Sequence, residues 1–421
     1  MSINILQLPI HILANILRNL KLGDIRNVIL TCKTFKNLIV NDNGVWRAIC
    51  EDRLILHNNS ERNDTSTWYN KCRISKNWWN GIYKRKVILQ TSSNYMPWLK
   101  YHNSEFLIFS LGSELFCHAS DQKGFPNSRA NWKINVPTVK RSDVRTNDIS
   151  RFVVSDNMIA CGNRDGSLSI YKVKKMKKRP RLIQHIKDCH EEGQVEVSAV
   201  EIIESVDGYF IVTASGKSPS VVLWQSNERC LFQSEIDIAI PNGNAVKSLA
   251  VSNTKDMLAV GLDGNSWPIL LDVNTATILM TAERTVNVRQ VVRDIQWRNE
   301  NTIIYVTHSG MLNQIDTRIQ KIVYDAKDPF LSRLYCVKTD HNNAILVGSS
   351  EYSRCVLFDA RNRSSHVQMY FTQRRPSPVY SLDFDSTKLI AAADRGLTVL
   401  NFNINGKAIR QRDYSHVFHS M

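Results

Sequence analysis

The sequence predicts a mainly β protein, in which a seven-bladed β-propeller follows a small all-α segment. Near the N-terminus apolar residues recur at helical spacing, whereas from about residue 87 short strands alternate with Gly, Asn and Asp turns. Six strands end in similar apolar residues at steps of 53, 47, 44, 43 and 44 residues: Tyr171, Trp224, Leu271, Ile315, Phe358 and Phe402. Four-stranded units repeating every ~40–45 residues are typical of a propeller. A further unit around Phe106–Ala119 brings the number of blades to seven.

Residues 1–52 are expected to form several short helices. Ile12, Leu13, Ile16 and Leu17 recur at helical spacing, and Pro9 suits the first turn of their helix. Asp24 is predicted to cap a second helix. A segment of this size builds only a small core, so we expect it to need a partner.

Residues 53–86 form a predicted helical linker that mixes aromatic and basic residues, with Trp68, Tyr69, Trp78 and Trp79 among them. Such a mixture can bind nucleic acid. It is equally compatible with a helix that packs its aromatic rings between two domains and leaves its basic residues in water. We favour the second interpretation.

Residues 87–407 make up the predicted propeller, and residues 408–421 a C-terminal tail. The seventh unit contains Val379–Phe384 and Leu389–Ala392 but shows no outer strand after Phe402. Val87–Gln90 precedes the first blade and is predicted to supply that strand. The two ends of the array would then be joined in one sheet, leaving no free edge.

Composition excludes several classes of protein. The 421 residues are 43% hydrophobic and 22% charged, as in globular domains, and no apolar run approaches the ~18–20 residues of a membrane span. The net charge of +15 divides into +2 on residues 1–61, +6 on residues 62–86 and +7 on residues 172–181, with zero elsewhere. A nucleic-acid-binding propeller is therefore not expected. Nine scattered Cys are interpreted as reduced thiols of a cytoplasmic or nuclear protein.

The N-terminal residues resemble an F-box. The resemblance rests on Leu8-Pro9 with the helical apolar residues that follow, on Cys32-Lys33-x-Phe35 and on Trp46-Arg47-x-x-Cys50. With degenerate WD40-like repeats behind it, the chain is similar to the F-box/WD-repeat family. That resemblance implies a non-catalytic, cofactor-free subunit of an SCF-type ubiquitin ligase. Its F-box would dock on Skp1, and through Skp1 on a cullin-RING ligase, while its propeller holds a protein substrate.

The apolar residues of the first 52 positions exceed what one short helix buries, so an exposed part of them is expected to meet a partner. The alternative, in which they form only an internal core, stays open for some of them. The predicted Skp1 contacts are Leu8, Pro9, Ile12, Leu13, Ile16, Leu17, Ile25, Val28, Cys32, Phe35 and Trp46.

A substrate site is predicted at one mouth of the central channel. The residue after the first apolar position of each inner strand is expected there: Ser150, Ser198, Lys247, Arg293, Tyr335 and Tyr380. Nearby loops add further cations: Arg145, Arg164, Lys217, Arg289, Arg333, Arg375 and Arg395. Convergent guanidinium groups suit an anionic or phosphorylated peptide. The alternative is neutralisation by adjacent acids, namely Asp143, Asp165, Asp294 and Asp394.

Two other features leave alternatives open. His185, Cys189 and His190 suggest a metal site, but a second ligand pair is missing and we expect a solvated loop and no metal. Lys174–Arg181 is either a nuclear-import signal, an RNA contact or an unstructured, solvated loop. No phosphate loop, H-E-x-x-H or G-x-S-x-G motif occurs, so no catalytic residue is predicted. The alternative function is a propeller scaffold for signalling or RNA-protein assemblies without ubiquitin transfer.

Overall fold

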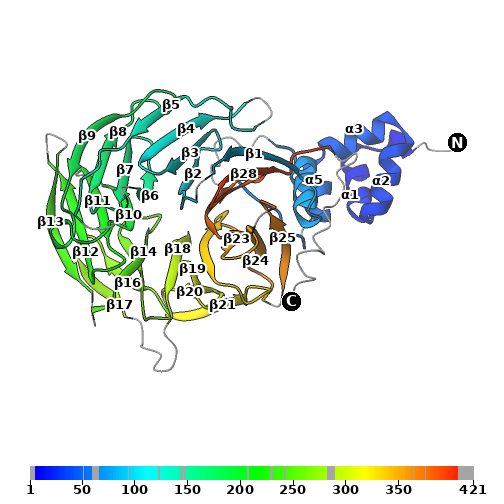
Figure 1. The fold of residues 1–421 in the computed structure, drawn as a ribbon. Helices are drawn as coiled ribbons and strands as arrows, with labels where there is room; N and C mark the ends of the chain where they lie inside the picture. The colour runs from blue at the N-terminus through cyan, green and yellow to red at the C-terminus, as the bar shows by residue number, and fades with distance from the viewer. Residues whose placement is uncertain are drawn as a thin grey trace.

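A computed structural model describes residues 5–50, 52–58, 66–92, 94–121, 124–142, 146, 148–205, 208–227, 231–240, 243–281, 290–363, 365–374 and 376–405. Most of these residues form a ring of seven four-stranded antiparallel sheets, and the N-terminal helices lie to one side of the ring (Figure 1). The predicted seven-bladed propeller behind a small helical segment is confirmed. The predicted tail, residues 408–421, lies outside the described residues.

Each blade runs outward from an inner strand that contacts the inner strands of its neighbours. From the inside outward, blades 1 to 4 are β2 (Leu99–His102), β3 (Phe106–Leu111), β4 (Glu114–Ala119) and β5 (Trp132–Asn135); β6 (Ile149–Val154), β7 (Met158–Asn163), β8 (Leu168–Lys172) and β9 (Arg181–Ile186); β10 (Ala199–Ser205), β11 (Gly208–Ala214), β12 (Ser220–Ser226) and β13 (Phe232–Ala239); β14 (Val246–Val251), β15 (Met257–Leu262), β16 (Ile269–Asp272) and β17 (Thr277–Met280).

Blades 5 to 7 are β18 (Val292–Asn299), β19 (Thr302–Thr307), β20 (Met311–Asp316) and β21 (Lys321–Lys327); β22 (Leu334–Thr339), β23 (Ala344–Ser349), β24 (Arg354–Asp359) and β25 (His366–Phe371); β26 (Val379–Phe384), β27 (Lys388–Ala393), β28 (Gly396–Asn401) and β1 (Lys84–Gln90). The second strand of a blade, such as β7 or β23, is buried along its whole length because neighbouring blades cover both faces. These strands are therefore continuous apolar runs rather than alternating ones.

The ring closes through the strand that precedes the first blade. β1 pairs antiparallel with β28, from Lys84 opposite Asn401 to Gln90 opposite Gly396. The prediction that Val87–Gln90 supplies the outer strand of the seventh blade is confirmed. Each blade thereby has four strands, and the first and last parts of the ring share a sheet.

Gly396 is required where β28 begins. Its φ of +152° lies in a region that L side chains rarely adopt, and an added Cβ would lie 3.0 Å from the carbonyl carbon of Leu89 on β1. The closing pair of strands therefore approaches more closely at this point than a side chain permits.

Four short helices form the N-terminal region: α1 (Ile10–Arg18), α2 (Leu22–Thr31), α3 (Lys33–Asn41) and α4 (Asn43–Ile49), after the 3₁₀ turn η1 (Ile5–Gln7). Asp42 caps α4 by accepting a hydrogen bond from the Val45 N–H at 3.0 Å. The prediction that Asp24 caps the second helix is wrong, since α2 begins at Leu22 and Asp24 lies in its first turn. In the first turn its carboxylate interacts favourably with the positive end of the helix dipole.

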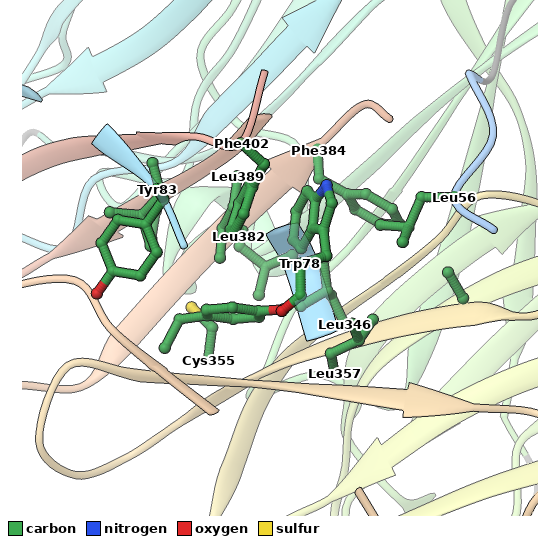
Figure 2. Packing of buried hydrophobic residues seen from close by; sticks show 14 of the residues in the cluster. Leu56, Trp78, Tyr83, Leu346, Cys355, Leu357, Leu382, Phe384, Leu389 and Phe402 are labelled. Carbon is green, nitrogen blue, oxygen red and sulfur yellow. The ribbon is translucent and has the colours of Figure 1, made fainter. Parts of the chain in front are cut away.

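A fifth helix, α5 (Trp68–Trp79), attaches this region to the propeller. Trp78 is fully buried and stacks on Phe402 with ring centroids 3.6 Å apart (Figure 2). Its indole N–H donates to the carbonyl of Ser386 at 2.8 Å, and the Tyr370 hydroxyl donates to the Trp78 carbonyl, also at 2.8 Å. The interpretation of the aromatic linker as a packing helix is thus confirmed for Trp78.

The other face of α5 packs on the N-terminal helices. Cys72 and Trp68 contact a core that includes Leu17, Ile25 and Trp46. A disulfide joins Cys72 to Cys50 at the end of α4, with their Cα atoms 6.5 Å apart. The expectation that all nine cysteines are reduced is therefore wrong for this pair. Sequence spacing did not reveal it, because the two Cys come from different helices.

Candidate functional site

In five blades a β-bulge directs one side chain of the inner strand toward the channel mouth. In five blades the strand register shifts at the second residue of the inner strand, leaving it without a partner on the neighbouring strand. A bulge of this kind redirects its side chain out of the sheet. The residues at these bulges are Ser150, Lys247, Arg293, Tyr335 and Tyr380, all of them predicted from the sequence.

Three of the bulge residues form a continuous contact across blades 5, 6 and 7. The Arg293 guanidinium lies over the Tyr335 ring, 5.4 Å from its centroid. Tyr335 meets Tyr380 edge to face, with centroids 5.8 Å apart. The Tyr380 hydroxyl donates to Asp394 Oδ1 at 2.7 Å. The structure thus brings together three side chains that lie more than 40 residues apart in sequence.

Arg293 has no carboxylate partner among the described residues. Its guanidinium donates to His308 Nδ1, with Nε and Nη2 at 3.2 and 3.1 Å. Burial lowers the pKa of His308, and the positive charges of Arg293 and Arg333 lower it further. The imidazole is therefore neutral near pH 7 and accepts from Arg293, so the local charge remains positive.

Lys247, Ser150 and Ser198 are more strongly engaged. The Lys247 ammonium lies 3.6 Å from Asp263 Oδ2 and donates to the Gly216 carbonyl at 2.6 Å. The Ser150 hydroxyl donates to backbone carbonyls, including that of Gly162 at 2.8 Å. Ser198 has a buried hydroxyl with no hydrogen-bond partner among the described residues.

The predicted loop cations divide into three groups. Arg164 lies 3.6 Å from Glu196, and Arg395 donates to Asn94 Oδ1 at 2.8 Å. Lys217 and Arg333 are exposed and have no ion pair with a described residue. The remaining three lie outside the described residues: Arg145, Arg289 and Arg375.

The acids expected to neutralise these cations are engaged elsewhere. Asp165 accepts from the Ser167 hydroxyl at 2.6 Å, and Asp394 accepts from Tyr380. Asp294 pairs with Arg151 at 3.1 Å instead of with its neighbour Arg293. None of these three acids forms an ion pair with a described predicted cation, whereas Arg164 and Lys247 pair with other acids, Glu196 and Asp263. Asp394 itself lies at the mouth through Tyr380. Asp143 lies outside the described residues.

The Arg151–Asp294 pair braces the channel below the mouth. It connects the inner strands of blades 2 and 5, and both side chains are buried, with exposures of 9% and 5%. Arg151 also lies over the Trp98 ring at 4.0 Å, while Asp294 accepts from the Val337 N–H at 2.9 Å. Sequence reasoning missed this pair. The available signal was a charge of opposite sign at the third position of the two inner strands, β6 and β18.

The N-terminal helices expose an apolar surface. Ile5, Ile10 and Ile16 are 48%, 70% and 42% exposed, on η1 and α1. Among the eleven predicted Skp1 contacts, Pro9, Ile12 and Ile16 are exposed. Four others are half-buried: Leu8, Val28, Cys32 and Phe35. The last four are buried in the described structure: Leu13, Leu17, Ile25 and Trp46.

The buried four agree with the alternative that some of these residues are internal core. Sequence reasoning missed Ile5, Leu6, Ile10 and Leu30, each at least 38% exposed. Helical spacing identified α1, but it did not establish which apolar positions face the rest of the domain. That division is set by packing against α4 and α5, which bring Leu17 under cover and leave its neighbours in solvent.

The helical region and the channel mouth lie on opposite faces of the propeller. The His57 N–H donates to Asp340 Oδ2 at 3.0 Å, in the turn between β22 and β23, and Trp78 reaches Ser386 between β26 and β27. The mouth residues Lys217 and Arg395 lie in turns between second and third strands. Successive turns of an antiparallel blade lie at opposite ends of its strands. A partner on the helices and a ligand at the mouth therefore do not compete for space.

The predicted solvated loop at residues 185–190 is wrong in part. His190 and Cys189 are buried, and the His190 imidazole meets the Thr213 hydroxyl at 3.0 Å. Burial lowers the pKa of His190 to about 4, so the ring is neutral near pH 7. Within the described ranges no group of three or more His, Cys, Asp or Glu side chains is arranged to hold a metal.

The basic run Lys174–Arg181 forms the structured turn between β8 and β9, on the face opposite the mouth. The Trp132 indole N–H donates to the Met176 carbonyl at 2.7 Å, and the Met176 side chain packs against the core between blades 1 and 2. An unstructured loop is therefore the wrong description. Across the described part of the chain, no helix is long and apolar enough to cross a membrane.

Known proteins match both parts of this architecture. Residues 5–52 match the F-box-like family. F-box/WD repeat-containing protein 4 of Mus musculus is 23% identical over 344 residues, covering 79% of this chain and 77% of the mouse protein. The Homo sapiens protein of the same name is 24% identical over 344 residues, covering 79% of this chain and 76% of its own length. The chain thus carries an F-box-like domain in front of a seven-bladed propeller and is similar to F-box/WD repeat-containing protein 4.

Proposed function

We propose that this chain is the substrate-recognition subunit of an SCF-type ubiquitin ligase. F-box/WD-repeat proteins are generally receptors of this kind, and an F-box generally binds Skp1. The chain itself would perform no chemistry. It would hold substrate lysines close to the ubiquitin-charged enzyme and so raise their effective concentration.

The observation that carries this proposal is the rigid connection between two opposite surfaces. Trp78 fixes α5 in blades 6 and 7, and the remaining helices pack on α5. The exposed isoleucines lie on η1 and α1, away from the α5 contacts with blades 6 and 7, while the bulge residues lie at the mouth on the other face. A receptor needs this separation, because both partners have to be held at the same time and at a constant distance.

Skp1 is proposed to cover the exposed apolar surface of η1 and α1. Ile10→Asp with Ile16→Asp should abolish co-purification of Skp1 and cullin, since two charges would be buried at the interface. Ile319→Asp with Leu279→Asp is the matched control, because these propeller residues are 55% and 51% exposed. Near-stoichiometric Skp1 retained by the α1 variant, or absent from the unmodified chain, would contradict the proposal and favour the scaffold alternative.

An anionic peptide, including a phosphorylated one, is the proposed ligand of the mouth. Arg293 and Arg333 have no described carboxylate partner, and Arg293 lies over the Tyr335 ring, which in turn meets Tyr380. Guanidinium groups bind phosphate or carboxylate in a bidentate manner, and the rings provide apolar contact.

The test uses proteins that accumulate when residues 5–52 are deleted and that still bind the propeller. Arg293→Glu with Lys247→Glu should reduce their capture at least ten-fold, while Arg318→Glu with Lys255→Glu on the opposite face should leave it unchanged. Phosphatase treatment of the captured proteins distinguishes a phosphorylated peptide from one whose charge comes from carboxylates. Binding that is undiminished after this treatment would refute recognition of phosphate. We propose a cytoplasmic or nuclear location for this activity, with Lys174–Arg181 as the import signal.

A further inference from the structure

A basic cleft lies where the F-box-like helices meet blade 6. Its volume is about 560 Å³, within the range of small-molecule sites. Among the described residues that line it, none is acidic. The polar lining consists of Arg18 and Arg47 from α1 and α4, Arg53 and His57 after α4, Trp68 from α5, and Asn343 and Arg361 from blade 6.

Only one of the four arginines has a carboxylate partner among the described residues. Arg361 pairs with Asp359 through contacts of 2.7 to 3.2 Å, and this hydrogen bonding raises its pKa. Asp52 adds a weaker electrostatic contribution to Arg361. Arg18 donates to the neutral Asn15 side chain at 3.2 Å. The cleft therefore retains a surplus of positive charge.

The other two arginines are held by aromatic rings. Arg47 lies 5.8 Å from the ring centroid of Trp68, and Arg53 lies 5.4 Å from that of Trp79. Stacking orients a guanidinium without neutralising it and leaves its N–H groups free to donate. Both side chains are exposed, so an incoming ligand can reach them.

Gly44 leaves space for the Arg18 guanidinium. A Cβ at this position would lie 3.0 Å from the Arg18 guanidinium carbon and closer still to one of its nitrogens. The guanidinium of α1 is therefore packed directly against the backbone of α4, next to Arg47. Any larger residue at position 44 has to displace it.

Helix dipoles explain only part of this arrangement. Arg18 and Arg47 lie in the last turns of α1 and α4, where the helix dipole stabilises a cation. Arg53 and Arg361 lie outside helices and gain nothing from that effect. The three arginines without a described carboxylate partner, Arg18, Arg47 and Arg53, repel one another around the cleft, and a bound anion relieves that repulsion while using the planar donor geometry.

We propose that this cleft binds a compact polyanion that carries two or more phosphate groups. Its walls come from both the F-box-like helices and blade 6, so the ligand would bridge the two parts and stiffen their connection. The site is separate from the channel mouth, which lies on the opposite face. It also excludes the exposed isoleucines of η1 and α1.

The experiment titrates the full chain with sodium tripolyphosphate, orthophosphate and citrate, by calorimetry and by thermal melting. Tripolyphosphate should bind saturably, raise the melting temperature and bind at least ten-fold more tightly than citrate or orthophosphate. Arg18→Gln with Arg47→Gln should weaken tripolyphosphate binding at least ten-fold. Arg47→Lys, which keeps the charge but loses the fork, should weaken it several-fold.

The matched control is Lys174→Gln with Lys175→Gln, which removes the same charge from the β8–β9 turn and should change the affinity by less than two-fold. An equal loss in this control, or no saturable binding, overturns the proposal. Citrate binding as tightly as tripolyphosphate overturns the assignment to phosphate. Gly44→Ala retains every charge and should also weaken binding, so it provides the test should the double variant fail to fold. Skp1 co-purification is measured on the same proteins. If only the cleft proposal is wrong, Skp1 still co-purifies with the unmodified chain. If the F-box assignment is wrong, Skp1 does not co-purify.

Discussion

Trp78 and Phe402 stack face to face although they lie 324 positions apart in the sequence, with ring centroids 3.6 Å apart and an angle of 14° between the rings. Phe384 and Tyr83 lie against the pair (Figure 2), and Tyr370 meets Trp78 edge to face with ring centroids 5.5 Å apart. The F-box-like region is thus held by an aromatic core that belongs to the propeller.

Trp78→Ala should destabilise this connection by about 3–5 kcal/mol, the usual cost of removing a buried Trp. It also leaves the Ser386 carbonyl without its indole donor. Thermal melting of the full chain measures the effect. Trp68→Ala is the control, because Trp68 is only half-buried and lies on the other side of α5. Equal losses in both variants would contradict the central role of Trp78.

Gly396→Val should weaken closure of the ring by about 2 kcal/mol or more, through backbone strain and a clash with β1. Gly243→Ala is a suitable control. Gly243 also has a positive φ, +65°, but a Cβ there meets nothing within 4 Å. Denaturant midpoints should therefore fall much further for the variant at 396. Similar midpoints would mean that the β1–β28 pairing contributes little.

Arg354→Met should cost about 3–5 kcal/mol, because it leaves Asp328 charged and buried without its cation. The pair is 0% exposed on both sides, and Arg354 Nη2 lies 2.5 Å from Asp328 Oδ2. Adding Asp328→Asn should recover part of the loss, since the uncompensated charge is then removed. A double variant no more stable than the single one would show that geometry rather than charge is responsible.

Glu201 should make the stability depend on pH. Burial raises its pKa to about 7, although Arg151, Lys338 and Lys100 oppose the shift. The native state then holds a proton that the unfolded state releases near pH 4.5. Stability should therefore fall as the pH rises from about 4.5 to about 7, and stay level above that.

Glu201→Gln should remove this dependence and raise the stability at pH 8 by up to about 3 kcal/mol. Glu204→Gln is the control, since Glu204 pairs with Lys255 at the surface, 3.3 Å away. Free energies of unfolding measured from pH 4.5 to 8 provide the comparison. An unchanged slope in the Glu201 variant would exclude this residue as the source.

Most of the propeller follows from local sequence patterns. A four-stranded blade repeats its apolar positions, so the period, the inner strands and the bulge residues such as Lys247 and Tyr335 are all encoded within single repeats. The closing strand was predictable because one blade lacked a partner that only residues before the first blade can supply.

The features missed by sequence reasoning join residues from different repeats or helices. Arg151 pairs with Asp294 across the channel, 143 positions away, and no local pattern specifies that distance. The same applies to Cys50 with Cys72. The bulge residues Arg293, Tyr335 and Tyr380 lie together as expected, and their role in binding a substrate stays a prediction. The partners of the charges there depend on which loop faces which. The Asp next to Arg293 in sequence therefore points into the channel and pairs elsewhere.

Closure through β1 also sets an order of events during synthesis. Gln90 leaves the ribosome about 300 residues before its partner Gly396, which is roughly 15–60 s at 5–20 residues per second. Trp78 is likewise synthesised more than 300 residues before its stacking partner Phe402. The F-box-like helices are made first but acquire their fixed position last, when the final blade is complete. A nascent or prematurely terminated chain therefore lacks the aromatic core that fixes the F-box-like helices on the propeller, and only a finished ring holds the helices and the channel mouth in a constant arrangement.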